Sequence, residues 1–488
     1  MSYYGLPEKQ GLYDPAFERD ACGIGFVADI KGRKSHDIVE KGLQALINLT
    51  HRGACGCDDR TGDGAGVNLQ IPHEFFEREC RRLGFELPEP GQYGVGMIFL
   101  PHEADQRAVC ERRLEKVVAE ENQRVLGWRT VPVDSSPLGR LARDTQPVIR
   151  QIFVAGATGL DEAALNRKLY VIRKRVEAEV RKLPVSYFYV PSMSATTIVY
   201  KGMLLATQIS AFYQDLRDPA VKTALMLIHQ RYSTNTFPCW NLAHPFRYIA
   251  HNGEINTLKG NVNWMHARES VLASPLFGDD VKKLFPIIAP GGSDSAMIDN
   301  AIELLHLAGR SLPHAMMMVI PEAWSSNPHM PDSKRAFYEY HATLTEPWDG
   351  PAAMVFTDGR LVGGTLDRNG LRPCRYTVTH DDLVIMASET GVLPLKPQDV
   401  KHKGRLQPGR MFLVDTVQGR IIDDEEIKDQ MGARQPYRQW LNESLIHLED
   451  LPEPERVHEP DHETLLLRQR AFGYTQEDLR MILGPMSA

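Results

Sequence analysis

Long apolar runs are absent from this 488-residue sequence, and cysteines are few. No stretch approaches the roughly 18 to 20 consecutive apolar residues that a membrane-spanning helix needs. The N-terminal segment, MSYYGLPEKQGLYDPAFERD, lacks the apolar core of a secretory signal. The 7 cysteines are odd in number and too sparse for a disulfide framework, which suits a reducing compartment. We therefore expect a globular protein of the cytoplasm without membrane association.

An excess of positive charge is also missing. The chain has 56 Lys and Arg residues against 63 Asp and Glu residues, which gives a formal net charge of −7. Proteins that bind nucleic acids rely on clustered Lys and Arg in excess, so this function is disfavoured. Hydrophobic residues make up 42% of the chain and charged residues 24%, as in ordinary globular proteins.

Several familiar ligand-binding patterns are incomplete. The segment GDGAG lacks the Lys-Ser/Thr pair of a phosphate-binding loop, and no strand-anchored G-x-G-x-x-G occurs. The segment that begins at Asp59 superficially resembles a calcium loop, but its third position is Thr61 and its twelfth is Gln70 instead of Glu. Other metal-binding side chains, which lack a second paired motif, are His51, Cys55, Cys57 and His73. We expect no metal ion and no cofactor in this segment.

The length allows about three domains at roughly 150 residues each, although large single sandwiches also reach this size. Residues 1–21 are polar and show no sustained period. Past roughly Met431 the composition shifts, and residues 448–463 are rich in Pro and charge, as in a linker. A capped helix is predicted from Thr475. We expect one domain over residues 22–431, followed at 432–488 by a linker and the start of a further domain.

Within residues 22–431, segments whose apolar residues have the spacing of a strand alternate with segments whose apolar residues have the spacing of a helix. Every second residue after Cys22 is apolar, which predicts a half-buried strand, and helical spacing predicts a helix from His36 to about Gly53. Two extended runs on either side of Asp358 and Gly359 are typical of a hairpin. The same criteria predict helices at 161–183 and 293–309 and strands at 383–388, 410–415 and 419–424. Within 223–233 and within 246–256 they predict an apolar strand that runs into a polar loop.

Cys22 is the first candidate for chemistry. A lone cysteine is usually a small buried apolar residue. If the peptide bond after Ala21 were cut, however, Cys22 would carry a free α-amine beside its thiol. The amine has a pKa of about 7.7–8.0 against about 8.5 for a thiol, so it can accept the thiol proton near neutral pH. Such a nucleophile needs no histidine partner.

Four further candidates lie at the ends of predicted strands or at a helix entrance. Arg231 can bind a carboxylate through two parallel hydrogen bonds, although a solvated arginine would occupy the same kind of position. Asn252 and Gly253 offer the amide and backbone donors of an oxyanion hole, but Asn-Gly is also a common turn pair. Asp294 stands where either an N-cap or a partner for an ammonium group is expected.

These residues belong to ordered motifs that resemble class II glutamine amidotransferases, a family of N-terminal nucleophile hydrolases. The motifs are Cys-Gly-x-Gly-Phe at 22–26, HRG at 51–53, HQRYST at 229–234, HNG at 251–253 and GGSD at 291–294. DRNGLRPCRY and MASETGVL resemble the later sheet of the same domain, so the resemblance covers about residues 20 to 430. The details TGDGAG, HQRYSTNTFP and NGEINTLKGN are similar to the large chains of glutamate synthases in particular.

The resemblance implies an α+β fold, a four-layer αββα sandwich of two antiparallel sheets. It also implies that residues 1–21 are a propeptide. The implied site consists of Cys22 as nucleophile, Asn252 and Gly253 as oxyanion hole, Arg231 for the α-carboxylate of L-glutamine with Thr234 assisting, and Asp294 for the α-ammonium. Arg52 and Asp63 lie in the motif loops and receive no catalytic role.

The implied reaction is hydrolysis of L-glutamine to glutamate and ammonia through a thioester on Cys22. In glutamate synthases the ammonia passes to 2-oxoglutarate, in a part of the enzyme that uses FMN and an iron–sulfur cluster. Implied partners are therefore the remainder of the large chain and a small reductase subunit. This sequence contains nothing similar to that part, lacks a cysteine cluster for the iron–sulfur centre, and leaves the electron donor (NADPH, NADH or ferredoxin) open.

Two alternatives remain at the level of sequence. The chain could be the amidotransferase half of a phosphoribosyl-, sugar- or asparagine-forming enzyme, which the lack of a phosphate loop disfavours. It could also be a regulatory module that keeps residues 1–21 and binds glutamine without turnover.

Overall fold

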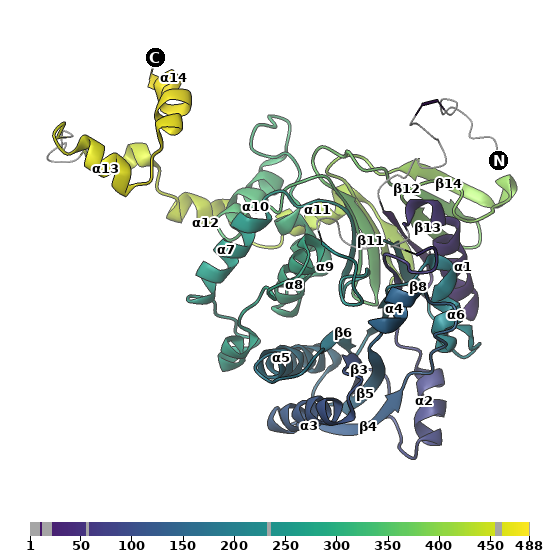
Figure 1. Cartoon of the computed structure of the whole chain (residues 1–488). Helices are drawn as coiled ribbons and strands as arrows, with labels where there is room; N and C mark the ends of the chain where they lie inside the picture. Colours follow the sequence, from purple (N-terminus) through teal and green to yellow (C-terminus); the bar gives the residue numbers. More distant parts are fainter. Residues whose placement is uncertain (1–9, 12–21, 55–57, 232–235, 454–460, 488) are drawn as a thin grey trace. The chain divides into compact units, whose positions relative to one another are not determined.

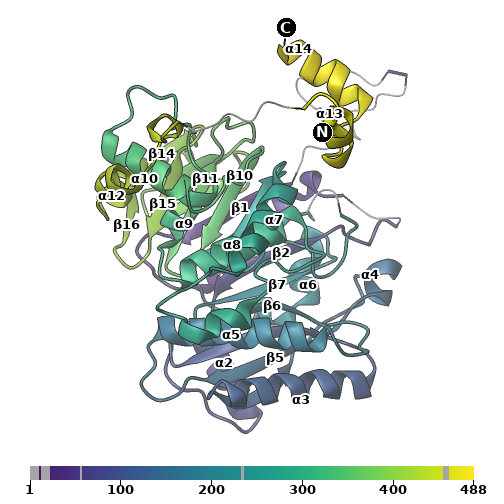
Figure 2. The same cartoon turned by 90° about the vertical axis from the view of Figure 1, so that its left-hand side faces the viewer.

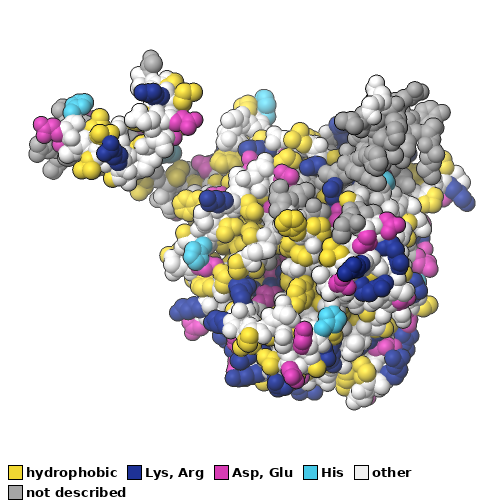
Figure 3. Space-filling view, in the orientation of Figure 1, with side chains coloured by type: hydrophobic (Ala, Val, Ile, Leu, Met, Phe, Trp, Pro, Cys, Tyr) yellow, Lys and Arg dark blue, Asp and Glu magenta, His cyan; other side chains and the backbone are white. Residues whose placement is uncertain are grey.

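The computed structural model describes residues 10–11, 22–54, 58–231, 236–453 and 461–487 (Figure 1). The chain forms two compact units, Met1–Arg438 and Gln439–Ala488, which are treated separately below. On the face seen in Figure 3, Lys and Arg side chains are interspersed with Asp and Glu side chains. This mixture agrees with the small negative net charge of the sequence.

The first sheet of the larger unit carries the strand that follows Cys22. Its seven described strands pair antiparallel in the order β14-β12-β13-β1-β8-β2-β7. They are β1 (Gly23–Asp29), β2 (Ala65–Gln70), β7 (Thr197–Gly202), β8 (Leu225–Gln230), β12 (Arg375–Thr379), β13 (Leu383–Ala387) and β14 (Val400–Arg405). The strands predicted after Cys22, within 223–233 and at 383–388, are confirmed as β1, β8 and β13.

A second antiparallel sheet packs against the first. Its described strands, in the order β16-β15-β11-β10-β9, are β9 (Ile249–Gly253), β10 (Ala352–Thr357), β11 (Leu361–Leu366), β15 (Met411–Asp415) and β16 (Arg420–Ile422). The core between the sheets contains Ile24, Phe26 and Ala28 of β1 with Ala353 and Val355 of β10. The period-2 pattern of the sequence therefore marks the inner face of β1, but the strand is buried on both faces and not half-buried as predicted, because Val27 on the other face belongs to a second core. Strands β10 and β11 form the predicted hairpin.

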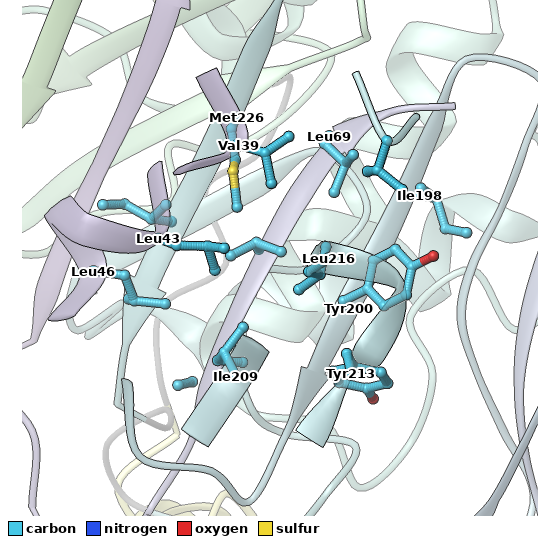
Figure 4. Packing of buried hydrophobic residues seen from close by; sticks show 14 of the residues in the cluster. Val39, Leu43, Leu46, Leu69, Ile198, Tyr200, Ile209, Tyr213, Leu216 and Met226 are labelled. Atoms are coloured by element: carbon cyan, nitrogen blue, oxygen red, sulfur yellow. The ribbon is translucent and has the colours of Figure 1, made fainter. Parts of the chain in front are cut away.

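Helices cover the outer faces of both sheets. Helix α1 (His36–Asn48) lies on the first sheet, and Figure 4 shows its Val39 and Leu43 near Met226 of β8, with Leu46 further along the same cluster. Helix α8 (Asp294–Leu307) lies against the second sheet, where its Asp299 carboxylate accepts hydrogen bonds from backbone N–H groups before β9. The four-layer αββα arrangement is thus confirmed. Helix α1 ends earlier than expected, and a short 3₁₀ turn, η2 (Thr50–Arg52), follows.

A third antiparallel sheet was not anticipated. Its described strands, in the order β4-β5-β3-β6, are β3 (Tyr93–Leu100), β4 (Arg124–Thr130), β5 (Val148–Ala155) and β6 (Tyr189–Ser194). Helices α3 (Ala104–Glu120) and α5 (Glu162–Val180) lie side by side on one face (Figure 2). Asp161 caps α5, because its carboxylate accepts a hydrogen bond from the Ala164 N–H at 2.7 Å, which confirms the helix predicted there.

The remaining elements are short or peripheral. The other described helices of the larger unit are α2 (His73–Arg82), α4 (Arg140–Asp144), α6 (Ile209–Phe212), α7 (Leu258–Glu269), α9 (Leu312–Val319), α10 (Asp332–Ala342) and α11 (Asp424–Gly432), and α12 spans Tyr437–Ser444. Further 3₁₀ turns are η3 (Ala206–Gln208), η4 (Gln214–Arg217), η5 (Gly278–Leu284), η6 (Pro397–Asp399) and η7 (Leu448–Asp450).

The smaller unit contains α13 (Leu465–Ala471), a π-helical turn η8 (Asp478–Leu483) and α14 (Gly484–Ser487). Thr475 and Asp478 form the predicted cap: the Thr475 N–H donates to the Asp478 carboxylate, and the Asp478 N–H donates to the Thr475 hydroxyl. Part of the predicted linker, residues 454–460, lies outside the described residues. Within the described chain, none of the helices combines the length and apolar character needed to span a membrane.

The end of the larger unit is anchored by Tyr437, beyond the boundary of 431 proposed from composition. The ring of Tyr437 is 3% exposed and lies 5.2–5.5 Å, between ring centroids, from Phe337, Tyr340 and His341. Arg438 follows and forms ion pairs with acidic residues of α10. Residues shortly after 431 therefore contribute to the packing of this unit.

We expect Tyr437→Ala to lower the free energy of unfolding by about 3 kcal/mol, because it removes a buried aromatic side chain and leaves a cavity. The matched control is Tyr474→Ala, since the Tyr474 side chain is 47% exposed. Urea denaturation followed by circular dichroism measures both. Equal stability of the two variants would contradict this packing role.

Candidate active site

The register of three neighbouring strands brings the candidate residues to one end of the first sheet. Gly23 of β1 pairs with Gln230 of β8, and Gln230 also pairs with Ala65 of β2. One residue further along, Cys22 lies beside Arg231, whose backbone N–H donates a hydrogen bond to the carbonyl of Gly64 at 2.7 Å. The predicted nucleophile and the predicted carboxylate-binding arginine are therefore neighbours.

The second sheet supplies an amide group to the same place. The side-chain Nδ2 of Asn252, in β9, donates a hydrogen bond to the backbone carbonyl of Cys22 at 3.2 Å. Asn252 is 1% exposed, and its Oδ1 atom has no hydrogen-bond partner among the described residues. Since an amide nitrogen carries two hydrogens, one contact to Cys22 leaves a second donor on Nδ2.

Gly253 occupies a position that only glycine tolerates. Its φ is +151°, and a Cβ atom added there would lie 1.7 Å from the carbonyl oxygen of Pro351. The residue pairs with Ala352 of β10, so the second sheet continues up to the site. An Asn-Gly pair at a sheet end beside a cysteine differs from a simple turn pair, and it can supply two donors to one oxygen atom.

Asp294 begins helix α8 but does not cap it. Ser293 is the cap, because its hydroxyl accepts a hydrogen bond from the Ala296 N–H at 3.2 Å. The Asp294 carboxylate instead accepts hydrogen bonds from the Ile255 N–H at 3.0 Å and the Ser295 N–H at 2.6 Å. It therefore joins the segment after Gly253 to α8, and the capping explanation of Asp294 is wrong.

Arg231 has a strained backbone and an acidic neighbour. Its φ of +117° is unusual for a residue with a side chain, and such strain is common in functional sites. The Nε atom of Arg231 lies 3.3 Å from Oδ2 of Asp63, which is 2% exposed. Burial raises the pKa of the Asp63 carboxyl to about 6, although the positive charge of Arg231 lowers it. Asp63 received no role in the sequence analysis, because a single acidic residue in a glycine-rich loop has no distinctive pattern.

The thiol of Cys22 is strongly affected by its surroundings. Burial and the charge of Asp63 raise its pKa, the positive charges of Arg231 and Arg372 oppose this rise, and the net result is a pKa of about 11. At neutral pH the thiol is therefore protonated in the chain with residues 1–21 attached, and attack on a carbonyl group requires a base. Arg372 was also missed, although it lies in the motif DRNGLRP noted in the sequence.

Two expected features cannot be located. Thr234 belongs to the segment 232–235, and Ala21 to the segment 12–21, and both segments lie outside the described residues. Arg52, from the HRG motif, donates a hydrogen bond through Nε to Glu389 at 2.5 Å, which ties this loop to the loop after β13. No group of three or more His, Cys, Asp or Glu side chains is placed to hold a metal ion in the described part of the chain.

The close approach at Gly253 yields a first test. Gly253→Ala should lower the free energy of unfolding by about 2 kcal/mol, because the added methyl group meets the Pro351 carbonyl at a positive φ. The control is Gly260→Ala in α7, where an added Cβ would have no neighbour within 4 Å. That change should raise stability by up to about 1 kcal/mol, as alanine favours helix. Chemical denaturation measures the free energy of unfolding of both variants. An unchanged value for Gly253→Ala would refute the close approach of Gly253 to Pro351.

The raised pKa of Cys22 yields a second test. In the folded chain with residues 1–21 retained, the rate of Cys22 alkylation by iodoacetamide should rise about tenfold per pH unit between pH 8 and 10, since only the thiolate reacts. Peptide mass spectrometry measures the rate at Cys22. In guanidinium chloride the same rate should level off above the ordinary thiol pKa of about 8.5. A plateau below pH 9 in the folded chain would show that burial does not control this thiol.

The chain is similar to a known family and to several known proteins. The family described as "Glutamine amidotransferases class-II" matches residues 22–440. The large chain of an NADPH glutamate synthase from Bacillus subtilis (strain 168) is 50% identical over 100% of this chain and 32% of that protein. An NADH glutamate synthase from Schizosaccharomyces pombe is 45% identical over 99% of this chain and 24% of that protein.

A ferredoxin-dependent glutamate synthase from Synechocystis sp. is 43% identical over 96% of this chain and 30% of that protein. The chain thus spans a third or less of the length of these relatives. The family match begins at Cys22 and covers Arg231, which follows β8, as well as β9 and α8. The chain therefore belongs to the class II glutamine amidotransferases.

Proposed function

We propose that this chain hydrolyses L-glutamine to glutamate and ammonia, with Cys22 as nucleophile after removal of the propeptide 1–21. The observation that carries the proposal is the meeting of Cys22, Asn252 and Arg231 where the two sheets end. A carboxylate-binding guanidinium, an amide donor and a thiol are the groups needed to hold an amino acid and attack its side-chain amide.

The first step follows from the raised pKa of the Cys22 thiol. Once the bond after Ala21 is cut, the new α-amine of Cys22 lies on the same residue as the thiol and accepts its proton. The sulfur then forms a bond to the side-chain carbonyl carbon of glutamine, and the carbonyl electrons move to the oxygen. No imidazole is required for this transfer.

Negative charge on that oxygen is stabilised by the second N–H of Asn252 and by the backbone N–H of Gly253. Removal of one such donor typically costs about 2.7–4 kcal/mol of transition-state stabilisation. The ammonium group of Cys22 returns the proton to the leaving nitrogen, the C–N bond breaks, and ammonia departs. Water then attacks the thioester, with the same amine as base, and releases glutamate and the free thiol.

The head group of glutamine is held by opposite charges. Arg231 binds the α-carboxylate, with Thr234 assisting, and Asp294 binds the α-ammonium. Asp294 suits this role because it is fixed by backbone donors on both sides, from Ile255 and from Ser295. Fixed protein charges against both charged groups of the α-carbon hold the side-chain amide in one position.

The wider role that we propose is that of the glutaminase domain of a glutamate synthase in the cytoplasm, in ammonia assimilation. All three relatives described above are named glutamate synthases, which supports this role over that of another biosynthetic amidotransferase. The ammonia would react with 2-oxoglutarate in the remainder of a longer large chain, where FMN and an iron–sulfur cluster are expected, with a small reductase subunit as a further partner. The names of the relatives give three different electron donors, NADPH, NADH and ferredoxin, so we propose no particular donor for this protein.

We expect Cys22→Ser to abolish release of ammonia from glutamine without a change in the melting temperature, because the serine hydroxyl is a far weaker nucleophile than a thiolate. Cys239→Ser, which changes a half-buried cysteine outside the proposed catalytic group, should retain activity. Intact mass shows whether residues 1–21 have been removed. Retention of these residues without glutaminase activity would favour a glutamine-binding regulatory module, and full activity of Cys22→Ser would refute the nucleophile.

A further inference from the structure

Asp63 is a buried acidic residue that the proposed mechanism does not use, and it faces the guanidinium of Arg231. Resting on the proposed function, we propose that Asp63 is a positioning residue that orients Arg231 for the α-carboxylate of glutamine. It thereby sets the preference of the site for substrates with a free carboxylate.

Arg231 is held on several sides, as a strained residue must be. Its N–H donates to the Gly64 carbonyl at 2.7 Å, and its own carbonyl lies 3.0 Å from Nδ1 of His229. Asp63, the residue before Gly64, reaches the side chain, with Oδ2 lying 3.3 Å from Nε. The dipeptide Asp63-Gly64 therefore contacts both the backbone and the guanidinium of Arg231.

The loop that carries Asp63 is itself fixed. The Asp63 N–H donates a hydrogen bond to the Ala54 carbonyl at 3.2 Å. Gly62 lies so close to the backbone of Leu204 that an added Cβ would be 2.1 Å from the Leu204 carbonyl carbon. Asp63 thus offers Arg231 a carboxylate on a rigid support.

A purely structural role explains Asp63 poorly. Burial raises the pKa of its carboxyl to about 6, so keeping it ionised at neutral pH works against folding. Its two oxygens accept no hydrogen bond of good geometry within the described residues, which a stabilising buried carboxylate would need. Retention of charge at such a position is typical of functional sites.

The direction of the contact indicates what Asp63 does. Asp63 faces the Nε atom, which leaves the two terminal nitrogens of the guanidinium for another carboxylate. A guanidinium binds a carboxylate best through two parallel hydrogen bonds, so the orientation of its plane matters. Loss of Asp63 should therefore weaken recognition of the carboxylate and leave the attack by Cys22 on the amide intact.

The test compares two substrates in each variant: L-glutamine, and L-glutaminamide, in which the α-carboxylate is a neutral carboxamide. Asp63→Asn should lower kcat/KM for glutamine by about tenfold, mainly through KM, because the guanidinium of Arg231 loses the charged partner that orients it. For glutaminamide kcat/KM should change less than about twofold. The ratio of the two values does not depend on how much of the variant is folded, so it remains informative if Asp63→Asn is unstable.

Asp58→Asn is the matched control, because it makes the same change in the same loop, where Asp58 holds the turn at Arg60 and Thr61. Its ratio of kcat/KM for glutamine to kcat/KM for glutaminamide should equal that of the wild type. Asp63→Glu, which keeps the charge but displaces the carboxylate, should give an intermediate ratio.

The outcomes separate the inference from the proposed function. In Asp63→Asn, kcat/KM could fall equally for both substrates, or the ratio of kcat/KM for glutamine to that for glutaminamide could rise. Either result would overturn the role of Asp63 and leave the glutaminase proposal standing. A wild-type chain that has lost residues 1–21 and hydrolyses neither substrate would overturn the proposed function and this inference with it.

Discussion

The antiparallel register of β1, β8 and β2 is the constraint on which the site depends. The pairing of Gly23 with Gln230, and of Gln230 with Ala65, carries Cys22, Arg231 and the loop before β2 to the same sheet end. Side chains alternate between the two faces of a strand, so a slip of one residue would turn Cys22 away from the second sheet. The core between the sheets prevents this slip, because Ile24 and Phe26 must stay on the inner face.

Opposing electrostatic effects meet at this sheet end. Burial raises the pKa values of Cys22 and Asp63, since both become charged on losing a proton, and Arg231 lowers both. Arg231 therefore offsets part of the burial cost of two groups while holding a strained backbone conformation. A site of this kind lowers stability locally and relies on the surrounding layers for compensation.

The third sheet and its helices add packing away from these residues. Tyr93, Met97 and Phe153 join the core that includes α1 and the outer face of the first sheet, which gives the site-bearing strands a continuous support. On the second sheet, Asp294 and Asp299 of α8 hold the segments that flank β9 by hydrogen bonds to their backbone N–H groups. The position of Asn252 therefore depends on both a strand pairing and a helix.

The sequence alone determined the strands after Cys22, the helices that start near Ser35 and Ser293, the hairpin at Asp358 and the motifs of the family. These features arise from local periodicity and turn chemistry, which act between residues close in the chain. Tertiary structure alone decided the third sheet, the strain at Arg231, the contact of Asn252 with Cys22 and the contact of Asp63 with Arg231. These depend on groups far apart in sequence, and on the removal of water from charges, which no local pattern records.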